Sequence, residues 1–272
     1  MTGRRIALVA WHVFKESVRD RVLYGIAGFA VVLVGVSLAI GQITAGQDVK
    51  IIKDFGLATI ELAGALIAIF IGIGLVAREI ERKSIFGLLA KPLPRWEFVA
   101  GKYLGLVLTV VVNVWAMGAA LFGVLAVLNW ISPDNIRLSW EAPALDPHLL
   151  LVLVMISVEL SLLTAVALFC STFSSSALVS VVLTVGIFVA GLISTDLRHF
   201  TDMVVVSPVV GHIVSAIGWM LPAFSEFDIK SQVVHGVDVP AGFVLFTLAY
   251  GLLYAAALVS GAVLLFSRRE FK

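Results

Sequence analysis

The sequence predicts an all-α integral membrane protein with six transmembrane helices, and three observations support this prediction. Hydrophobic residues make up 60% of the 272 residues and charged residues only 14%, whereas soluble domains contain about 25% charged residues. The mean hydropathy of the chain is +1.07. Six apolar runs are long enough for a helix to cross a hydrocarbon core of about 30 Å. We therefore expect one transmembrane domain over residues 1–272. Its spans are expected at residues 22–45, 57–77, 103–128, 148–171, 177–195 and 241–266.

An interfacial elbow helix is expected before the first span, over residues 1–21. Apolar side chains recur there at helical spacing and charged side chains occupy the opposite face, a pattern typical of a helix in the membrane interface. The apolar face consists of Ile6, Val9, Ala10, Val13, Phe14 and Val18. The alternative is a solvated helix that docks on a soluble partner. Because charged residues interrupt the segment, it lacks the apolar core of a removable signal peptide.

The distribution of Lys and Arg favours an orientation with both termini in the cytoplasm. The N-terminal segment holds five of these basic residues, residues 78–102 hold six, and the C-terminal tail holds three. The opposite side holds Lys50, Lys53, Arg137, Arg198 and Lys230. Since basic residues are enriched in cytoplasmic loops, residues 78–102 are predicted to be cytoplasmic and residues 196–240 to lie outside.

The longest predicted outer segment is residues 196–240. Its apolar middle part is interrupted by Pro208 and Gly211. A seventh span there would move the C-terminal basic cluster outside, against the charge bias. We therefore expect re-entrant or interfacial helices before the sixth span. His212 has no second metal ligand at helical spacing, so a metal site is not expected at this position.

The charged residues 78–102 predict two cytoplasmic helices joined by a break. The second span continues into the cytoplasm as a helix, and Lys91–Pro94 must end it because proline lacks an amide donor and clashes with the preceding turn. Pro94 then suits the start of a new helix that leads into the third span. Such a hairpin, joined rigidly to two spans, can transmit force. The alternative is an ordinary positive-inside loop.

This charged segment resembles the cytoplasmic segment after the second span in a known family. The matching positions are Arg78, Glu79, Glu81, Ser84, Leu88, Leu89, Lys91, Pro92, Arg95, Gly101 and Lys102. The family comprises the permease subunits of type-2 ATP-binding-cassette (ABC) exporters, and the similar branch includes copper-enzyme-maturation and gliding-motility permeases. The order of elbow helix, six spans and long outer segment also resembles this family.

The resemblance implies a permease subunit that dimerises with a second copy around a central pathway in a prokaryotic inner membrane. A separate cytoplasmic ATPase subunit would bind ATP and Mg²⁺ and dock on residues 78–102, which the family uses as its coupling segment. The residues implied in this coupling are Arg78, Glu79, Glu81, Arg82, Lys83, Ser84, Lys91, Pro92 and Arg95. The sequence has no GxxxxGK[ST] run, because Trp96 and Tyr103 flank Gly101-Lys102 where glycine and Ser or Thr are required. We therefore expect no cofactor on the chain.

Two carboxylates lie within the predicted spans, where a charge is costly and is by default a functional hypothesis. Glu61 lies about one turn inside the outer boundary, where snorkelling or pairing with a neighbouring loop is favoured. Glu159 lies roughly 16 Å from the start of its span, near mid-membrane. Asn113, midway along the third span, is a candidate hydrogen-bond partner of Glu159. An ion- or proton-coupled carrier or channel that uses Glu61 and Glu159 is therefore the alternative function.

Other chemistry has little support in the sequence. An intramembrane enzyme is a distant alternative, because neither an HExxH nor a GxSxG motif occurs. The single cysteine, Cys170, gives no disulfide framework and no thiolate metal cluster. A net charge of +1 gives no support for nucleic-acid binding. Since Met, Cys and His form no metal-relay cluster, the copper association of the similar branch does not extend to this chain.

Overall fold

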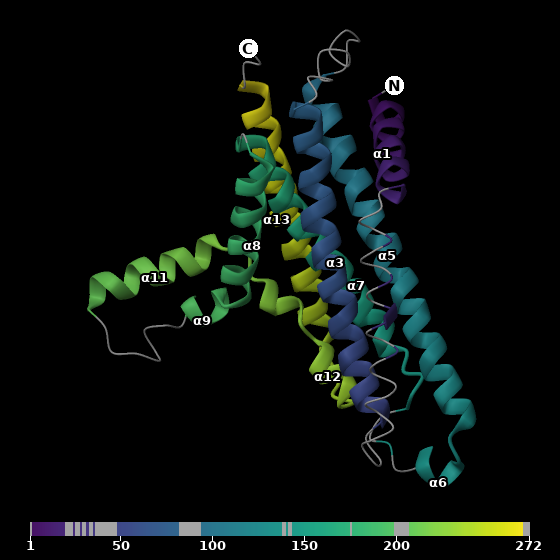
Figure 1. The fold of residues 1–272 in the computed structure, drawn as a ribbon. Helices are drawn as coiled ribbons and strands as arrows, with labels where there is room; N and C mark the ends of the chain where they lie inside the picture. The colour runs from purple at the N-terminus through teal and green to yellow at the C-terminus, as the bar shows by residue number, and fades with distance from the viewer. Residues whose placement is uncertain are drawn as a thin grey trace.

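The computed structural model describes residues 2–19, 48–81, 94–137, 140, 143–174, 176–198 and 207–268, and isolated positions at 24, 28, 31, 32 and 35. Every regular element in these residues is a helix (Figure 1). The helices are α1 (Thr2–Val18), α3 (Asp48–Glu81), α5 (Arg95–Ile131), α6 (Asp134–Arg137), α7 (His148–Phe173), α8 (Ala177–Leu192), α9 (Ser194–Arg198), α11 (Pro208–Met220), the 3-10 helix η1 (Phe224–Phe227), α12 (Lys230–Val234) and α13 (Ala241–Arg268). The predicted all-α class is confirmed for the described part of the chain.

Four of the described helices are long and apolar enough to cross a membrane: α3, α5, α7 and α13. A fifth candidate span is the pair Val209–Met220 and Phe224–Val234, which is bent by 50°. The chain is therefore a multi-pass membrane protein. The number six stays a prediction, because the first expected span, residues 22–45, lies outside the described residues apart from isolated positions.

Helix α8, in the fifth predicted span, has only 16 residues, which is about 24 Å of helix and less than the roughly 30 Å hydrocarbon core. It ends at Leu192, after which the chain turns into the short helix α9. Gly191 permits this end to lie against the outer segment, because a Cβ there would be 2.5 Å from the Pro222 carbonyl oxygen. Helix α8 thus ends where residues 222–224 lie against it.

Helix α7 is the centre of the bundle. It contacts α3, α5, α8, α12, α13 and η1. In its most apolar stretch 78% is buried inside the protein, against 22% in the corresponding stretch of α13. Leu160 fills the space beside Gly64 of α3, where a Cβ would come within 2.3 Å of its side chain. Leu153 does the same beside Gly118 of α5, at 2.5 Å. Because glycine lets helices approach closely in lipid, these contacts fix α3 and α5 against α7.

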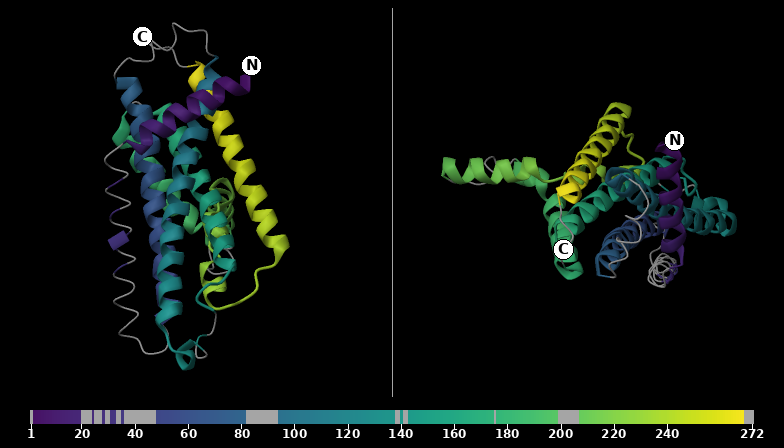
Figure 2. Two further views of the ribbon diagram at one scale, coloured as in Figure 1. Left: turned by 90° about the vertical axis from the view of Figure 1, so that its right-hand side faces the viewer. Right: turned by 90° about the horizontal axis from the view of Figure 1, so that it is seen from above.

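Helix α1 packs against the start of α5. Val13 is buried and the other residues of the predicted apolar face are partly buried, while Arg5, His12, Lys15 and Glu16 are exposed. The predicted amphipathic pattern is therefore present, and its apolar face meets a helix of the same chain. Figure 2 shows α1 lying obliquely across the bundle, at the end where α13 also finishes. The two terminal helices thus reach the same end of the molecule.

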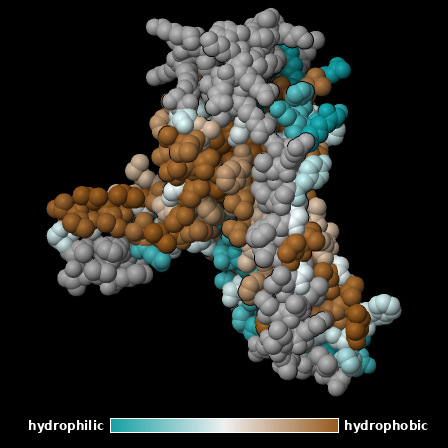
Figure 3. Space-filling model, viewed as in Figure 1, coloured by the Kyte–Doolittle hydropathy of each residue, from teal (hydrophilic) through white to brown (hydrophobic). Residues whose placement is uncertain are grey.

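The described outer segment has two parts: α11, which projects from the bundle, and η1 with α12, which pack against it. Helix α11 contacts α9 and points away from the bundle (Figures 1 and 2), and its surface is largely hydrophobic (Figure 3). The chain then bends at Pro222 and returns to the bundle as η1 and α12. Two tyrosines of α13 hold this bend: Tyr254 Oη donates to Met220 O at 2.7 Å, and Tyr250 Oη accepts from Ala223 N at 3.0 Å. Both a re-entrant hairpin and a broken span are compatible with this geometry.

We predict that Gly105→Ala loosens α1 from α5. A Cβ at residue 105 would lie 2.5 Å from Ala10 O and 2.7 Å from Val13 Cβ, and a backbone oxygen cannot move without shifting α1. Overpacking of this kind costs about 1–3 kcal/mol, so the melting temperature in detergent micelles should fall. Gly123→Ala is the matched control on the same helix, since nothing lies within 4 Å of its added Cβ. Equal melting temperatures for the two variants would contradict the proposed packing.

Candidate functional site

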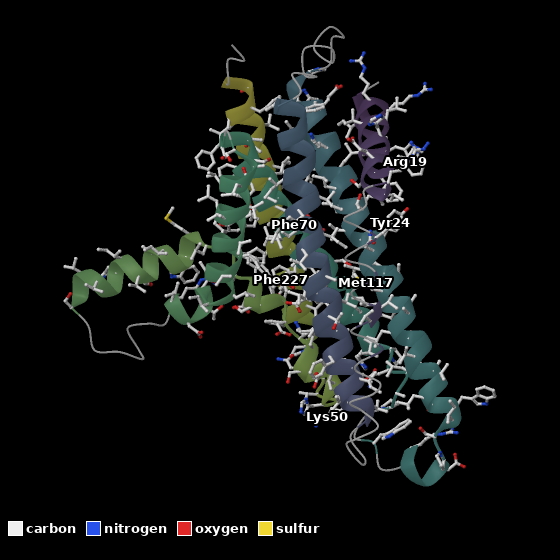
Figure 4. The ribbon with its side chains drawn as sticks, viewed as in Figure 1. Arg19, Tyr24, Lys50, Phe70, Met117 and Phe227 are labelled. Atoms are coloured by element: carbon white, nitrogen blue, oxygen red, sulfur yellow. The ribbon has the colours of Figure 1, made fainter. Side chains whose placement is uncertain are left out.

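The principal group of charged side chains inside the described bundle lies where α3, α7 and the returning outer segment meet. It comprises Asp54 and Glu61 of α3, Glu159 of α7, and Asp228 and Lys230 at the start of α12. We name these five residues the outer polar cluster. Helix α12 contacts both α3 and α7, and Figure 3 shows hydrophilic residues gathered along it, beneath an otherwise apolar surface. Figure 4 places Phe227, just before this group, at the centre of the bundle and Lys50 at the outer end of α3.

Lys230 is the central cation of the cluster. Its ammonium group forms ion pairs with Glu61 Oε2 and, at 3.4 Å, with Asp228 Oδ1. The side chains of Lys230 and Glu61 are only 16% and 17% exposed, whereas that of Asp228 is 52% exposed. The backbone N–H of Lys230 also donates to Asp228 Oδ1 at 3.2 Å, which fixes the start of α12. The pair thus fastens the outer segment to α3.

Asp54 extends the cluster towards the outer end of α3. It lies two helical turns before Glu61, so both carboxylates are on one face of the helix. Asp54 interacts electrostatically with His235, Lys50, Asp228 and Lys230. Asp54 therefore faces the outer segment, and α3 continues through it.

Glu159 is the most deeply buried member of the cluster, with 2% of its surface exposed. In the described part of the chain its carboxyl group makes no hydrogen bond and no ion pair, and its charged neighbour is Asp228, a like charge. Asn113 Nδ2 donates to Thr109 O at 2.8 Å, within its own helix. The structure therefore brings Glu159 close to Asp228, while its pairing with Asn113 stays a prediction.

Those predicted coupling residues that the structure describes lie at the other end of the bundle. Arg78, Glu79 and Glu81 are on the last turn of α3, and Arg95 is the first residue of α5. The remaining predicted residues, Arg82, Lys83, Ser84, Lys91 and Pro92, lie outside the described residues. The predicted hairpin and its break at Lys91–Pro94 therefore stay predictions.

The described start of α5 is held by three neighbouring helices. Buried Glu97 lies 4.0 Å from the Arg5 guanidinium of α1. Phe98 stacks on Phe266 of α13 with ring centroids 6.2 Å apart. Tyr103 Oη donates to Ser161 O of α7 at 3.3 Å. Any displacement of the chain just before α5 is therefore passed to α1, α7 and α13 together.

Sequence reasoning singled out Glu61 and Glu159 but did not place Asp54, Asp228 or Lys230 in a site. Snorkelling or pairing with a neighbouring loop is the interpretation that the sequence favours for Glu61, and the structure pairs it with Lys230. The sequence did contain a feature that could have indicated Lys230 as a partner of a carboxylate. Lys230 is one of the few basic residues on the predicted outer side, and it follows Asp228 by two residues. Among the described residues, no group of three or more His, Cys, Asp or Glu side chains could hold a metal ion.

The sequence matches one family model, which is described as ABC-2 family transporter protein, over residues 7–270. The match covers both the charged residues 78–102 and the five residues of the outer polar cluster. No curated protein matches the chain.

We predict that Lys230→Met destabilises the fold by about 1–3 kcal/mol. Glu61 would keep a largely buried charge without its cation, and the loss should be below the roughly 3–5 kcal/mol of fully buried pairs because both side chains retain some exposure. Chemical unfolding in mixed micelles measures the effect. Glu61→Gln should cost a similar amount, and the double variant should cost less than the sum of the two.

A matched control for this pair is Asp134→Asn, since Asp134 and Arg137 pair at 3.6 Å on the surface and the Asp134 side chain is 91% exposed. That variant should change stability by less than about 0.5 kcal/mol. Additive effects of Lys230→Met and Glu61→Gln would show that the two side chains do not interact.

Proposed function

The chain belongs to the ABC-2 family of transporter proteins, and from this membership of an ABC transporter permease family we propose its function. The chain transmits ATP hydrolysis on a separate cytoplasmic subunit to the outward movement of a substrate across a prokaryotic cell membrane. ATP and Mg²⁺ bind on that ATPase subunit. The match over residues 7–270 is the single observation that carries the proposal.

The geometry at the ends of α3 and α5 supports a coupling role for the charged segment. Helix α3 is continuous from Asp48 to Glu81, and α5 is continuous from Arg95 to Ile131. Residues 82–94 connect these two helices. A force applied to this connection therefore acts on the ends of two long helices. We propose that the ATPase docks there, on Arg78, Glu79, Glu81 and the predicted residues that follow them.

The orientation follows from the same segment. Helix α1 and the end of α13 lie at the end of the bundle where α3 finishes and α5 begins (Figure 2). The N-terminal segment, residues 78–102 and the C-terminal tail hold most of the basic residues of the chain. Since basic residues are enriched on the cytoplasmic side, we propose that this end is cytoplasmic and that the outer polar cluster faces the other side.

We propose that the chain works as a homodimer. The exposed faces of α8, α11 and α13 carry large apolar side chains, among them Val182, Val189, Ile213, Ile217, Phe246 and Leu253. In a membrane such faces contact either lipid or another protein. A second permease copy is the partner that a half-transporter needs to enclose a pathway.

A second candidate function is an ion- or proton-coupled carrier. The observation that favours it is Glu159, which is 2% exposed inside a membrane helix, where ionisable groups often mark ion pathways. A carrier of this kind works without an ATPase subunit. The two candidates therefore differ in whether the chain has an ATP-hydrolysing partner.

We predict that the affinity-tagged chain copurifies with a soluble ATPase and raises its rate of ATP hydrolysis. Replacing both Glu79 and Glu81 by Lys should weaken binding of the ATPase at least about tenfold, because like charges at an interface cost several kcal/mol. Arg82→Ala should also uncouple hydrolysis from transport. Binding by pull-down and phosphate release measure the two effects.

The control for charge changes at this end is Glu16→Gln, an exposed residue of α1, which should leave ATPase binding unchanged. A stable chain that transports substrate without any ATPase partner would overturn the proposal and favour the carrier. Full binding by the Glu79 and Glu81 variant would overturn the docking site alone.

A further inference from the structure

The predicted apolar face of helix α1 is used inside the protein. Val13 is only 5% exposed, and a Cβ at Gly105 of α5 would lie 2.7 Å from its Cβ. A Cβ at Gly101 would be equally close to Val9 Cβ. That face is therefore taken up by packing against a helix of the same chain. A membrane or a partner can meet α1 only on its opposite face.

The opposite face of α1 carries a row of exposed side chains that combines basic and apolar groups. Their spacing of i, i+4, i+7, i+11 and i+15 places them on one side of the helix. They are Arg4, Leu8, Trp11, Lys15 and Arg19, and we name them the basic stripe. Leu8 and Trp11 are 62% and 51% exposed, and the Lys15 ammonium group lies over the Trp11 ring, 5.4 Å from its centroid. The stripe thus holds three cations and no carboxylate beside two exposed apolar side chains.

The basic stripe lies at the level where a membrane boundary is predicted. Gly101 and Gly105, where α1 crosses α5, flank residue 103, the predicted start of the third span. The left-hand view of Figure 2 shows α1 in front of the bundle, so its opposite face is directed away from the protein. In the orientation proposed above, on which this inference rests, this end of the bundle is cytoplasmic. The basic stripe then contacts the headgroup layer of the cytoplasmic leaflet.

The mixture of side chains favours a headgroup layer over a soluble partner. Tryptophan is enriched at membrane–water interfaces, where its ring lies at the level of the headgroups. Lys and Arg reach the phosphate groups from such a position, with their aliphatic stems along apolar surface, and their hydrogen bonds to phosphate are charge-assisted. Because the stripe has no carboxylate, it attracts anionic headgroups more strongly than zwitterionic ones. Charge complementarity therefore selects anionic phospholipid.

We propose that the basic stripe of α1 binds anionic phospholipids of the cytoplasmic leaflet. Leu8 and Trp11 contact the acyl chains next to the headgroups, and the three cations of the stripe bind phosphate groups. Because α1 also packs against the start of α5, where the Arg5 guanidinium lies 4.0 Å from the Glu97 carboxylate, bound lipid holds the start of α5 in place. This part of α5 follows the segment on which the ATPase is proposed to dock.

The test uses the full chain in phosphatidylcholine nanodiscs that contain a minor fraction of brominated lipid, either phosphatidylglycerol or phosphatidylcholine with the same acyl chains. Bromine quenches tryptophan fluorescence at contact. The chain has six tryptophans, so the signal of Trp11 is the difference between the wild-type chain and Trp11→Phe. We expect half of the quenching of Trp11 to need less brominated phosphatidylglycerol than phosphatidylcholine, by more than about tenfold. The stripe holds three basic residues, each worth roughly fivefold near an anionic surface.

Variants of the stripe should remove this preference. Lys15→Gln combined with Arg19→Gln leaves at most the roughly fivefold effect of Arg4, whereas Lys15→Arg keeps the charge and should retain the wild-type preference. Each variant is compared with the same chain carrying Trp11→Phe. High salt should also reduce the preference, because it screens exposed charges. Arg137→Gln is the matched control, since it removes a cation from helix α6 and should leave the preference unchanged.

Equal quenching of Trp11 by the two brominated lipids would overturn the inference, as would a preference that the double variant retains. No quenching by either lipid, together with loss of ATPase copurification in the double variant, would assign the stripe to the ATPase. The proposed function is tested separately by ATPase copurification with the wild-type chain. A chain that binds an ATPase without a lipid preference would retain the proposed function and lose the lipid site. A chain with the lipid preference and no ATPase would do the reverse.

Discussion

Close packing of α7 against glycines of its neighbours is the contact on which the rest of the bundle depends. Leu160 and Leu153 occupy the positions beside Gly64 of α3 and Gly118 of α5, and Val158 lies 2.9 Å from a Cβ built at Gly251 of α13. Helices in lipid gain nothing from removing apolar surface from water, so shape complementarity decides which of them associate. Three helices are thereby placed around one, and this arrangement brings Glu61 of α3 and Glu159 of α7 into the same part of the bundle.

The central position of α7 explains why Glu159 is enclosed. Described helices contact α7 on several sides and η1 and α12 lie on the side towards Asp228, so that Glu159 is only 2% exposed. The outer segment can close there because Tyr250 and Tyr254 of α13 bind the backbone on either side of Pro222. The packing of the outer segment against the bundle brings Lys230 to Glu61, and the helix propensity of α12 alone would not do so. The short helix α12, with 5 residues, would have little stability alone.

The sequence predicted the parts of the fold that depend on apolar length and period, and missed what depends on contacts between distant segments. The run predicted at 148–171 is the helix His148–Phe173, and the amphipathic N-terminal pattern is present in α1. Helix α3 extends further than its predicted span, because Lys53 is buried and donates to Pro143 O at 2.7 Å, a partner that no periodicity reveals. The cluster around Lys230 could not be predicted from the sequence either. Glu61, Glu159 and Lys230 belong to three separate segments, and only tertiary packing brings these segments together.

Helix α3 carries residues of both the outer polar cluster and the proposed docking site for the ATPase. Its last turn carries Arg78, Glu79 and Glu81, and the first half of the same continuous helix carries Asp54 and Glu61. Its 34 residues span about 51 Å at 1.5 Å per residue. A continuous helix held by close packing moves as a unit, so a displacement at the proposed ATPase end changes the position of Glu61 relative to Lys230, which is held on α12. Coupling between the proposed ATPase end and the outer polar cluster therefore needs no chain of intermediate residues, because helix α3 belongs to both. The Glu61–Lys230 ion pair is the contact that a movement of α3 would break.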